Sequence, residues 1–282
     1  MPTDPISVLG AGSWGTALAI RLATKYDTLL WGHEPNVMST LAAERENSKF
    51  LPGIQFPERL RIEADLATAV HASRNLLIVV PSHAFREVIK NISGHLRDDS
   101  RIAWATKGLE HGSGKFMSDV LDEELGTKYP AAVVSGPTFA LEVARGLPTA
   151  LTVASNNPAF ANDMAAHLHG DVMRVYTSDD MLGVQLGGTV KNVLAIASGI
   201  TDGLQLGANS RAALSTRGLA EIIRLGDAMG ARRETLMGLA GVGDLILTCT
   251  DDLSRNRRLG LALGRGTALN VAVEEIGQVV EG

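Results

Sequence analysis

The sequence contains very little cysteine. Cys249 is the single cysteine among 282 residues, so a framework of internal disulfides is excluded. No group of Cys and His residues has the spacing of a zinc site, and we expect no bound metal. The absence of disulfides is typical of a protein in a reducing cytoplasm.

Long apolar stretches and runs of basic residues are also missing. No segment reaches the roughly 18 apolar residues of a membrane span, and the N-terminus lacks the basic and apolar regions of a signal peptide. The net charge is −5, and no Lys/Arg-rich run of the kind that binds nucleic acids occurs. We therefore expect a soluble, cytoplasmic protein with no membrane span and no nucleic-acid partner.

Apolar residues and glycine, in contrast, are plentiful. Hydrophobic residues make up 45% of the chain and charged residues 20%, which allows a large core and excludes disorder of the whole chain. Glycine occurs 30 times. This excess indicates tight turns and close approach of the backbone to another backbone or to a ligand.

Short β-branched apolar runs alternate with helical patterns in the first part of the chain. The alternation predicts an α/β fold with a mostly parallel sheet covered by helices on both faces. Helices such as Trp14–Thr24, Ala84–Ile92 and Ala159–Leu168 separate the expected strands. The strands are expected at Ile6–Gly10, Thr28–Gly32, Leu76–Pro81, Ile102–Thr106, Ala131–Ser135, Ala150–Ala154 and Val172–Tyr176.

The pattern changes after Tyr176–Asp180. From Met181 onward, Ala, Leu and Gly recur with helical periodicity, and no strand is predicted. We expect one domain over residues 1–180 and an all-helical domain over residues 181–282.

A glycine-rich turn follows the first expected strand. Gly10-x-Gly12-x-x-Gly15 lies between that strand and an apolar helix, which is the context that a dinucleotide-binding fingerprint requires. The first glycine permits the turn, the second lets the backbone approach a pyrophosphate, and the third packs the helix on the strand. The N–H groups at the start of the helix then face the phosphates.

The end of the second expected strand bears on the choice between NAD and NADP. His33 and Glu34 follow this strand. A histidine here can accept a 2′-phosphate, whereas a glutamate favours the free 2′-hydroxyl of NAD. The two residues leave the preference open, and His33 as a plain turn residue remains an alternative.

The stretch "GVQLGGTVKNVLAIASG" places a charge in small, apolar surroundings. In a helix, Gly187 and Gly188 lie beside Lys191 on one face, and each costs roughly 1 kcal/mol relative to Ala. Two reasons for that cost are open at this point: close packing of helices, or room for a ligand at the lysine.

Other polar groups lie next to glycines and at the ends of elements. Asp244 and Thr248 share one face if "DLILT" is helical, and Cys249 is expected to be a small buried residue. The remaining groups are Lys107 after one strand, Gly136 and Thr138 after another, and Ser254, Arg255 and Asn256 near the end.

Several of these stretches together resemble bacterial-type NAD(P)-dependent glycerol-3-phosphate dehydrogenase. The stretches are "GAGSWGTALA", "ATKGLE", "SGPTFA", "GVQLGGTVKNVLAIASG", "RAALSTRGLAE", "GLAGVGDLILTCT", "SRNRRLG" and "VVEG". The resemblance implies a Rossmann-like N-terminal domain with a doubly wound sheet and a helical substrate domain. It also implies interconversion of dihydroxyacetone phosphate and sn-glycerol 3-phosphate with NAD(P)(H), which feeds phospholipid synthesis. It leaves a homodimer open.

The resemblance also assigns residues. Lys191 matches the proton-transferring lysine, and Asp244 is carried over beside it as a catalytic residue. The positions implied for the substrate are Lys107, Gly136, Thr138, Lys191, Asp244, Ser254, Arg255 and Asn256. The positions implied for the cofactor are Gly10, Gly12, Ser13, Trp14, Gly15, His33, Phe50, Lys107, Ala140, Arg255, Val279 and Glu281.

The resemblance suggests why Lys191 lies among glycines: the substrate and the nicotinamide ring must approach it. A lysine that snorkels from a core helix is the alternative. If Asp244 is adjacent, it positions the lysine and opposes deprotonation, while Lys107 and Arg255 clamp phosphate.

Two other functions are alternatives to this interpretation, and the sequence departs from the family pattern at one point. A hydroxyacid dehydrogenase of the 6-phosphogluconate type also has two domains and an active-site lysine, but its substrate carries a carboxylate. An idle NADP-sensing or scaffold protein would be expected to lack the lysine, the aspartate or the arginine. The family continues beyond "VVEG", so we expect the helical domain to be truncated at its C-terminus.

Overall fold

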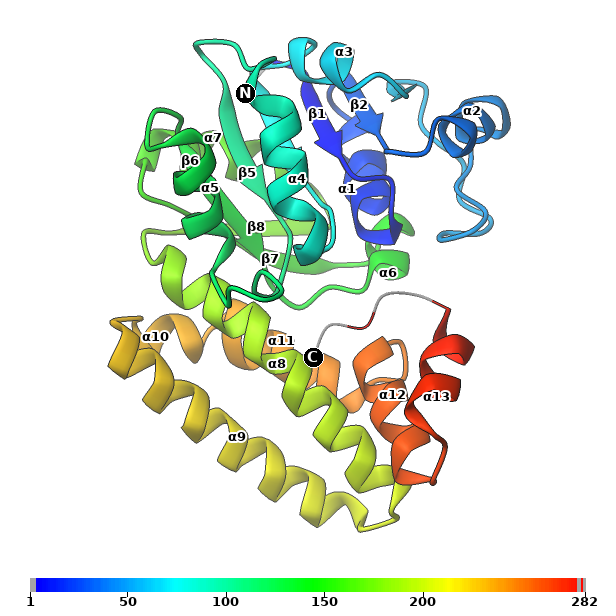
Figure 1. Cartoon of the computed structure of the whole chain (residues 1–282), viewed down its shortest axis with the longest axis vertical. Coiled ribbons are helices and arrows are strands. Elements are labelled where there is room, and N and C mark those ends of the chain that lie inside the picture. Colours follow the sequence, from blue (N-terminus) through cyan, green and yellow to red (C-terminus); the bar gives the residue numbers. More distant parts are fainter. Residues whose placement is uncertain (1–3, 278–279, 281–282) are drawn as a thin grey trace. The chain divides into compact units, whose positions relative to one another are not determined.

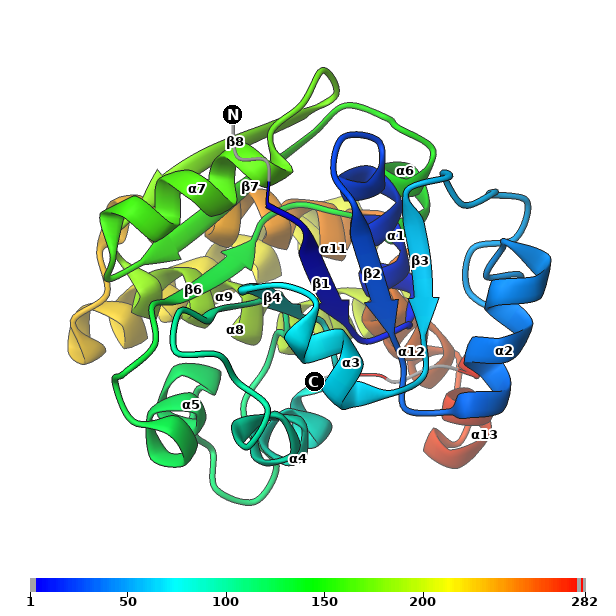
Figure 2. The same cartoon turned by 90° about the horizontal axis from the view of Figure 1, so that it is seen from above.

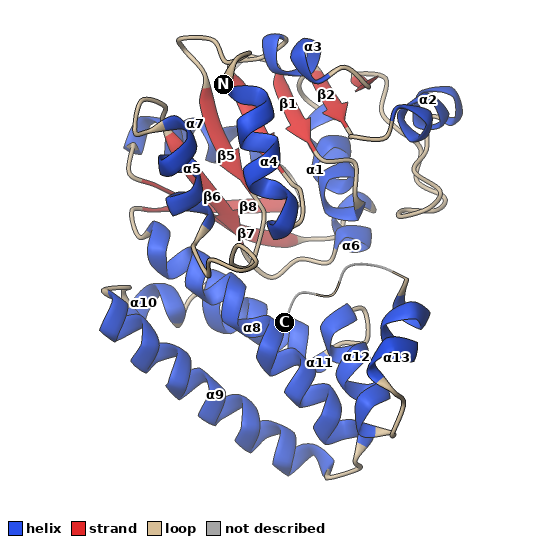
Figure 3. Cartoon of the chain, in the orientation of Figure 1, coloured by secondary structure: helices blue, strands red, loops and turns tan. Residues whose placement is uncertain are grey.

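The computed structural model describes residues 4–277 and 280, and the chain divides into two units. The first comprises residues 4–134 and 138–179, and the second comprises residues 135–137 and those from Asp180 onward. All strands of the described residues belong to one sheet, and the region from Asp180 onward is helical (Figure 3). The prediction of an α/β N-terminal part followed by a helical part is confirmed.

The sheet has eight strands in the order β3-β2-β1-β4-β5-β6-β7-β8. All the strand pairs for which a register is given are parallel; Val8 of β1, for example, is aligned with Leu30 and Leu77. The strands are β1 (Ile6–Leu9), β2 (Thr28–Trp31), β3 (Leu60–Glu63), β4 (Asn75–Ile78), β5 (Arg101–Trp104), β6 (Ala131–Ser135), β7 (Thr149–Ser155) and β8 (Met173–Ser178).

This strand order has a switch point beside β1. The chain runs from β1 outward through β2 and β3, and it then returns to β4 on the other side of β1 (Figure 2). Ligands of open α/β sheets bind at such a point, outside the carboxyl ends of the strands. The turn that follows β1 therefore occupies the position where a nucleotide is expected.

Helices cover both faces of the sheet (Figures 1 and 2). Two of them, α1 and α6, pack together on one face, while α4 and α5 pack together on the other. The helices of the first unit are α1 (Ser13–Ala23), α2 (Pro35–Glu44), α3 (Leu66–His71), α4 (Ser82–Ser93), α5 (Met117–Leu125), α6 (Ala140–Ala144) and α7 (Pro158–Leu168).

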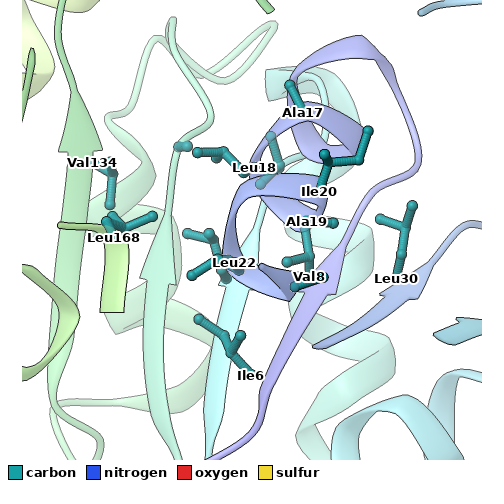
Figure 4. Close-up of a cluster of buried hydrophobic side chains, with 14 of the residues drawn as sticks. Ile6, Val8, Ala17, Leu18, Ala19, Ile20, Leu22, Leu30, Val134 and Leu168 are labelled. Atoms are coloured by element: carbon teal, nitrogen blue, oxygen red, sulfur yellow. The ribbon is translucent and has the colours of Figure 1, made fainter. Parts of the chain in front are cut away.

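The core of the first unit lies between α1 and the central strands (Figure 4). Leu18 and Leu22 of α1 are buried together with Ile6 and Val8 of β1, and these side chains are at most 1% exposed. All four residues of β1 are buried, as expected for a central parallel strand. This packing fixes the start of α1, and with it the glycine-rich turn.

One strand, β3, was not predicted. It lies at the edge of the sheet, and of its residues only Leu60 is fully buried. Charged Arg61 and Glu63 alternate with Leu60 and Ile62, so β3 lacks the continuous apolar run of a central parallel strand.

In the second unit, glycines allow two helices to pack with their backbones in contact. A Cβ on Gly260 would lie 1.9 Å from the Ile196 carbonyl oxygen, and one on Gly199 would lie 2.1 Å from that of Arg257. The helices of this unit are α8 (Met181–Gly203), α9 (Gly207–Met229), α10 (Arg233–Leu236), α11 (Asp244–Thr250), α12 (Arg255–Gly264) and α13 (Leu269–Ile276), with a π-helical turn, η1 (Leu239–Gly243), before α11. None of the helices among the described residues is both long and apolar enough to cross a membrane.

Candidate active site

The glycine-rich turn is packed against the sheet on one side and open on the other. A Cβ on Gly10 would lie 2.3 Å from the Val79 carbonyl oxygen, and Gly10 has a φ of +128° that L side chains rarely adopt. A Cβ on Gly15 would lie 1.9 Å from the Gly10 carbonyl oxygen. At Gly12, by contrast, a Cβ would meet nothing within 4 Å. The space at Gly12 fits a ligand that approaches the backbone.

The start of α1 is suited to an anion. Gly12 is the N-cap residue, no side chain caps it, and the first turn contains no acidic residue. Because the first N–H groups of a helix have no partner within it, they are donors for a phosphate. The turn and the helix start therefore fit the pyrophosphate of a dinucleotide.

The other expected cofactor residues of the first unit vary in exposure. The side chain of His33 is 83% exposed, and its Nε2 lies 3.7 Å from Glu34 Oε1. Phe50 is partly buried, with Lys49 Nζ 5.2 Å from its ring centroid. Ser13 and Trp14 begin α1 and are half-buried, as is Ala140 at the start of α6. Val279 and Glu281 lie outside the described residues.

Lys107 lies in the loop that follows β5 and is half-buried. Three residues further on, Glu110 forms an ion pair with Arg86 of α4 at 2.5 Å. Its hydrogen bonds with Arg86 and Ser113 lower the pKa of the Glu110 carboxyl to about 2. This ion pair anchors the loop to α4, and Lys107 belongs to the same loop.

The centre of the second unit is a buried group of three side chains. Lys191 Nζ donates hydrogen bonds to Asp244 Oδ1 at 2.5 Å and to Thr248 Oγ1 at 3.1 Å. Lys191 is 7% exposed and Asp244 is fully buried. Thr248 donates in turn to the Asp244 carbonyl oxygen at 2.6 Å, so the two residues share one face of α11 as predicted. The carboxylate and the hydroxyl therefore hold the ammonium in a fixed position.

Gly187, four residues before Lys191, has a different role from the predicted one. A Cβ on Gly187 would lie 2.5 Å from the Ala240 carbonyl oxygen in η1. Gly187 thus allows α8 to pack against the π-helical turn that leads into Asp244. The interpretation that it makes room for a ligand is wrong, and the alternative of close helix packing is correct for this residue.

The start of α12 brings three further candidate residues together. Ser254 is the N-cap residue and accepts a hydrogen bond from the Arg257 N–H at 3.2 Å. Arg255 and Asn256 form the first turn, and Asn256 Oδ1 is buried without a hydrogen-bond partner among the described residues. A buried carbonyl oxygen without a donor is costly, so Asn256 is suited to accept a hydrogen bond from a ligand.

Sequence reasoning missed Arg257, although it lies within the "SRNRRLG" stretch. Its Nε donates to the Cys249 carbonyl oxygen at 3.2 Å, and its guanidinium forms ion pairs with Asp202 of α8 and Asp252. Arg257 therefore ties the start of α12 to both α8 and α11. A series of arginines in sequence does not reveal which of them is buried.

Cys249 is a free, buried residue, as predicted. Burial raises the pKa of its thiol to about 11. A thiol of this kind is neutral and unreactive at physiological pH. Within the described part of the chain, no cluster of three His, Cys, Asp or Glu residues is arranged to hold a metal ion.

Both parts of the chain match one protein family. The family model described as the N-terminus of NAD-dependent glycerol-3-phosphate dehydrogenase matches residues 5–161, and that of the C-terminus matches residues 180–282. Glycerol-3-phosphate dehydrogenase (NAD(P)+) of Thioalkalivibrio sulfidiphilus is 60% identical, over 100% of this chain and 85% of its own length. The corresponding protein of Shewanella frigidimarina is 60% identical, over 98% of this chain and 82% of its own length.

A solved structure agrees with these matches. The crystal structure of glycerol-3-phosphate dehydrogenase from Coxiella burnetii has a TM-score of 0.96 and is 52% identical, covering 99% of this chain and 86% of its own. The sequence matches and this fold lead to one conclusion: the chain belongs to the NAD-dependent glycerol-3-phosphate dehydrogenase family.

Proposed function

We propose that the chain interconverts dihydroxyacetone phosphate and sn-glycerol 3-phosphate by hydride transfer with NAD(P)(H). The observation that carries the proposal is the buried pair of Lys191 and Asp244, with Nζ and Oδ1 2.5 Å apart, in a chain whose family has this activity. A buried ion pair is costly unless its geometry is good, and it adds little to stability even then. A catalytic role explains its presence better than a stabilising one.

Residues 1–180 are proposed as the dinucleotide-binding domain. Gly10 and Gly15 shape the turn, the backbone at Gly12 approaches the pyrophosphate, and the N–H groups of Ser13 and Trp14 donate to it. The space at Gly12 and the absence of a side-chain cap at α1 support this role. The other residues proposed for the cofactor are His33, Phe50, Lys107, Ala140, Arg255, Val279 and Glu281.

Residues 181–282 are proposed as the substrate domain, with Lys191 as the proton donor. When bound, the reduced nicotinamide supplies a hydride to the ketone carbon. Lys191 gives a proton from its ammonium to the carbonyl oxygen, which yields the alcohol, and its neutral amine then takes up a proton from water. Asp244 and Thr248 fix Nζ through their hydrogen bonds. In the oxidising direction, Lys191 accepts the hydroxyl proton.

The remaining groups are proposed to hold the substrate. Arg255 and Lys107 carry the positive charge that a phosphate requires, and an arginine can bind it through two parallel hydrogen bonds. Asn256 Oδ1 accepts a hydrogen bond from a substrate hydroxyl, which would satisfy its buried oxygen. Gly136, Thr138 and Ser254 complete the proposed substrate site.

We further propose that the protein acts in the cytoplasm and supplies glycerol 3-phosphate for phospholipid synthesis. Its single cysteine is a free thiol, which fits a reducing compartment.

The test follows the nicotinamide absorbance of the purified chain with three substrates, as oxidation of NADPH or NADH for the two ketones and as reduction of NADP+ or NAD+ for 6-phosphogluconate. Dihydroxyacetone phosphate is expected to react, unphosphorylated dihydroxyacetone to react poorly, and 6-phosphogluconate with the oxidised cofactors not to react. Turnover of 6-phosphogluconate alone would favour a hydroxyacid dehydrogenase. Nucleotide binding without any turnover would favour a sensing or scaffold protein.

A further inference from the structure

Asn47 is a buried residue that the site described above does not include. It follows α2, in the connection to β3, and is 2% exposed. Its Nδ2 donates to the Ala11 carbonyl oxygen at 3.1 Å and to Thr16 Oγ1 at 2.9 Å. One amide group thus contacts residues that are 36 and 31 positions away in the sequence.

Both partners of this amide belong to the glycine-rich turn and the first turn of α1. Ala11 lies between Gly10 and Gly12, and Thr16 follows Gly15 and is fully buried. The Thr16 N–H also donates to the Gly12 carbonyl oxygen at 2.9 Å. Asn47 therefore holds the peptide carbonyl just before Gly12 and the Thr16 hydroxyl in the first turn of α1, on either side of the position where the backbone is open to a ligand.

The backbone of Asn47 closes a second turn. Its carbonyl oxygen accepts hydrogen bonds from the N–H groups of Phe50 at 3.1 Å and Leu51 at 2.7 Å. Leu51 is 1% exposed and belongs to the core, so this turn is anchored. The neighbouring Glu46 braces the same loop, since its carboxylate accepts hydrogen bonds from the Gly53 N–H and from Gln55 Nε2, each at 2.8 Å.

We propose that Asn47 is a positioning residue for the dinucleotide. Its side chain holds the glycine-rich turn and its main chain holds the turn that presents Phe50, so it sets the distance between two segments that line the cofactor. The inference rests on the proposed function, because it assumes that both segments bind NAD(P)(H). Asn47 does not contact the reacting atoms, and it acts on affinity through these segments.

The first unit offers a matched control in Asn75. This residue is also fully buried at the start of β4, where its Oδ1 accepts from Arg101 Nε at 2.8 Å and its Nδ2 donates to the Pro5 carbonyl oxygen at 3.4 Å. It lies at the amino end of β4, and the glycine-rich turn contacts Val79, beyond the carboxyl end of that strand. Loss of either amide costs hydrogen bonds in the same unit, but only one of them reaches the cofactor segments.

The experiment measures the dissociation constant for NADPH by calorimetry, without substrate, for the wild type, Asn47→Ala and Asn75→Ala. We expect Asn47→Ala to raise the dissociation constant about tenfold, with kcat at saturating NADPH and the KM for dihydroxyacetone phosphate nearly unchanged. Asn75→Ala should lower the melting temperature and leave the dissociation constant as it is. A second variant, Thr16→Val, removes one of the two acceptors at nearly constant shape and should weaken binding less than Asn47→Ala.

Three results would overturn the inference: unchanged NADPH affinity in Asn47→Ala, unchanged affinity in Thr16→Val if Asn47→Ala does not fold, or an equal loss of affinity in Asn75→Ala. In each case the wild type still binds NADPH, so the proposed function stands. If the wild type binds neither NADPH nor NADH, the proposed function itself fails, which is a separate outcome.

Discussion

Two glycines, Gly12 in the first unit and Gly260 in the second, have opposite surroundings. In the first unit, Gly12 faces open space, where a Cβ would meet nothing within 4 Å. In the second unit, Gly260 and Gly199 face another backbone, so that α8 and α12 can touch. Glycine thus leaves open space beside the backbone at Gly12, and it allows close helix packing at Gly260 and Gly199.

The groups proposed to act in each unit also differ. In the first unit they are main-chain N–H groups at the start of α1, which need residues without bulky side chains. In the second unit they are the side chains of Lys191 on α8 and of Asp244 and Thr248 on α11. Substitutions should therefore affect cofactor affinity in the first unit and turnover in the second.

The largest expected effect is on turnover in the second unit. Lys191→Ala removes the proposed proton donor, and kcat should fall about 10²- to 10⁴-fold. The dissociation constant for NADPH should stay close to that of the wild type, because the turn at Gly12 is unchanged. Single-turnover kinetics and calorimetry measure the two quantities. Near-normal turnover in a folded variant would remove Lys191 from the mechanism.

The next prediction compares two glycines directly. Gly260→Ala places a methyl group 1.9 Å from the Ile196 carbonyl oxygen, and we expect the melting temperature to fall by roughly 10 °C. Gly12→Ala meets no protein atom, so the melting temperature should change by about 2 °C or less, while NADPH binding is lost. Thermal unfolding of both variants checks the stability effects. An equal loss of stability in the two variants would contradict the difference between the open surroundings of Gly12 and the packed surroundings of Gly260.

A smaller effect is expected at the start of α12. Arg255→Ala should weaken the reaction with dihydroxyacetone phosphate far more than that with dihydroxyacetone, because only the former carries the phosphate. The quantity to measure is the ratio of kcat/KM for the two substrates. As a control, Arg258→Ala removes an exposed arginine of the same helix and should leave the ratio unchanged. If both substrates suffer equally in Arg255→Ala, the arginine does not read the phosphate.

The smallest effect is expected at His33, whose exposed position contrasts with that of buried Lys191. The side chain follows β2, where the ribose of the dinucleotide is expected, and a ring N–H of the imidazole can donate a hydrogen bond to a 2′-phosphate. We expect both cofactors to be used, and we expect His33→Ala to lower the preference for NADPH over NADH about two- to fivefold. The measurement is the ratio of kcat/KM for the two cofactors in the wild type and in His33→Ala. An unchanged ratio in the variant would assign the recognition of the ribose to another residue.

The sequence predicts the local features of this molecule well. The glycine-rich turn, the α/β pattern and the shared face of Asp244 and Thr248 all depend on neighbouring residues, so periodicity and short motifs reveal them. The edge strand β3 was missed because charged residues interrupt its short apolar run.

Contacts between distant segments could not be predicted in the same way. Asn47 forms a hydrogen bond with Ala11, 36 positions away, and Arg257 forms one with Asp202, 55 positions away. Neither residue belongs to a short motif that indicates such a contact. Gly187 was misinterpreted for the same reason: its neighbour Ala240 is remote in the sequence, and only the fold shows that helix packing requires the glycine. The prediction of functional roles for the side chains rests on the family resemblance.

The central claim is that Lys191 and Asp244 act together as one proton-transferring group, and a double-mutant cycle tests it most directly. The measurement is kcat for Lys191→Ala, Asp244→Asn and the double variant, with folding checked by thermal unfolding. If Asp244 acts through Lys191, the double variant should be no slower than Lys191→Ala alone, since residues that act as a unit are not additive. Losses in kcat that multiply in the double variant would show that the two residues act independently and would contradict the account.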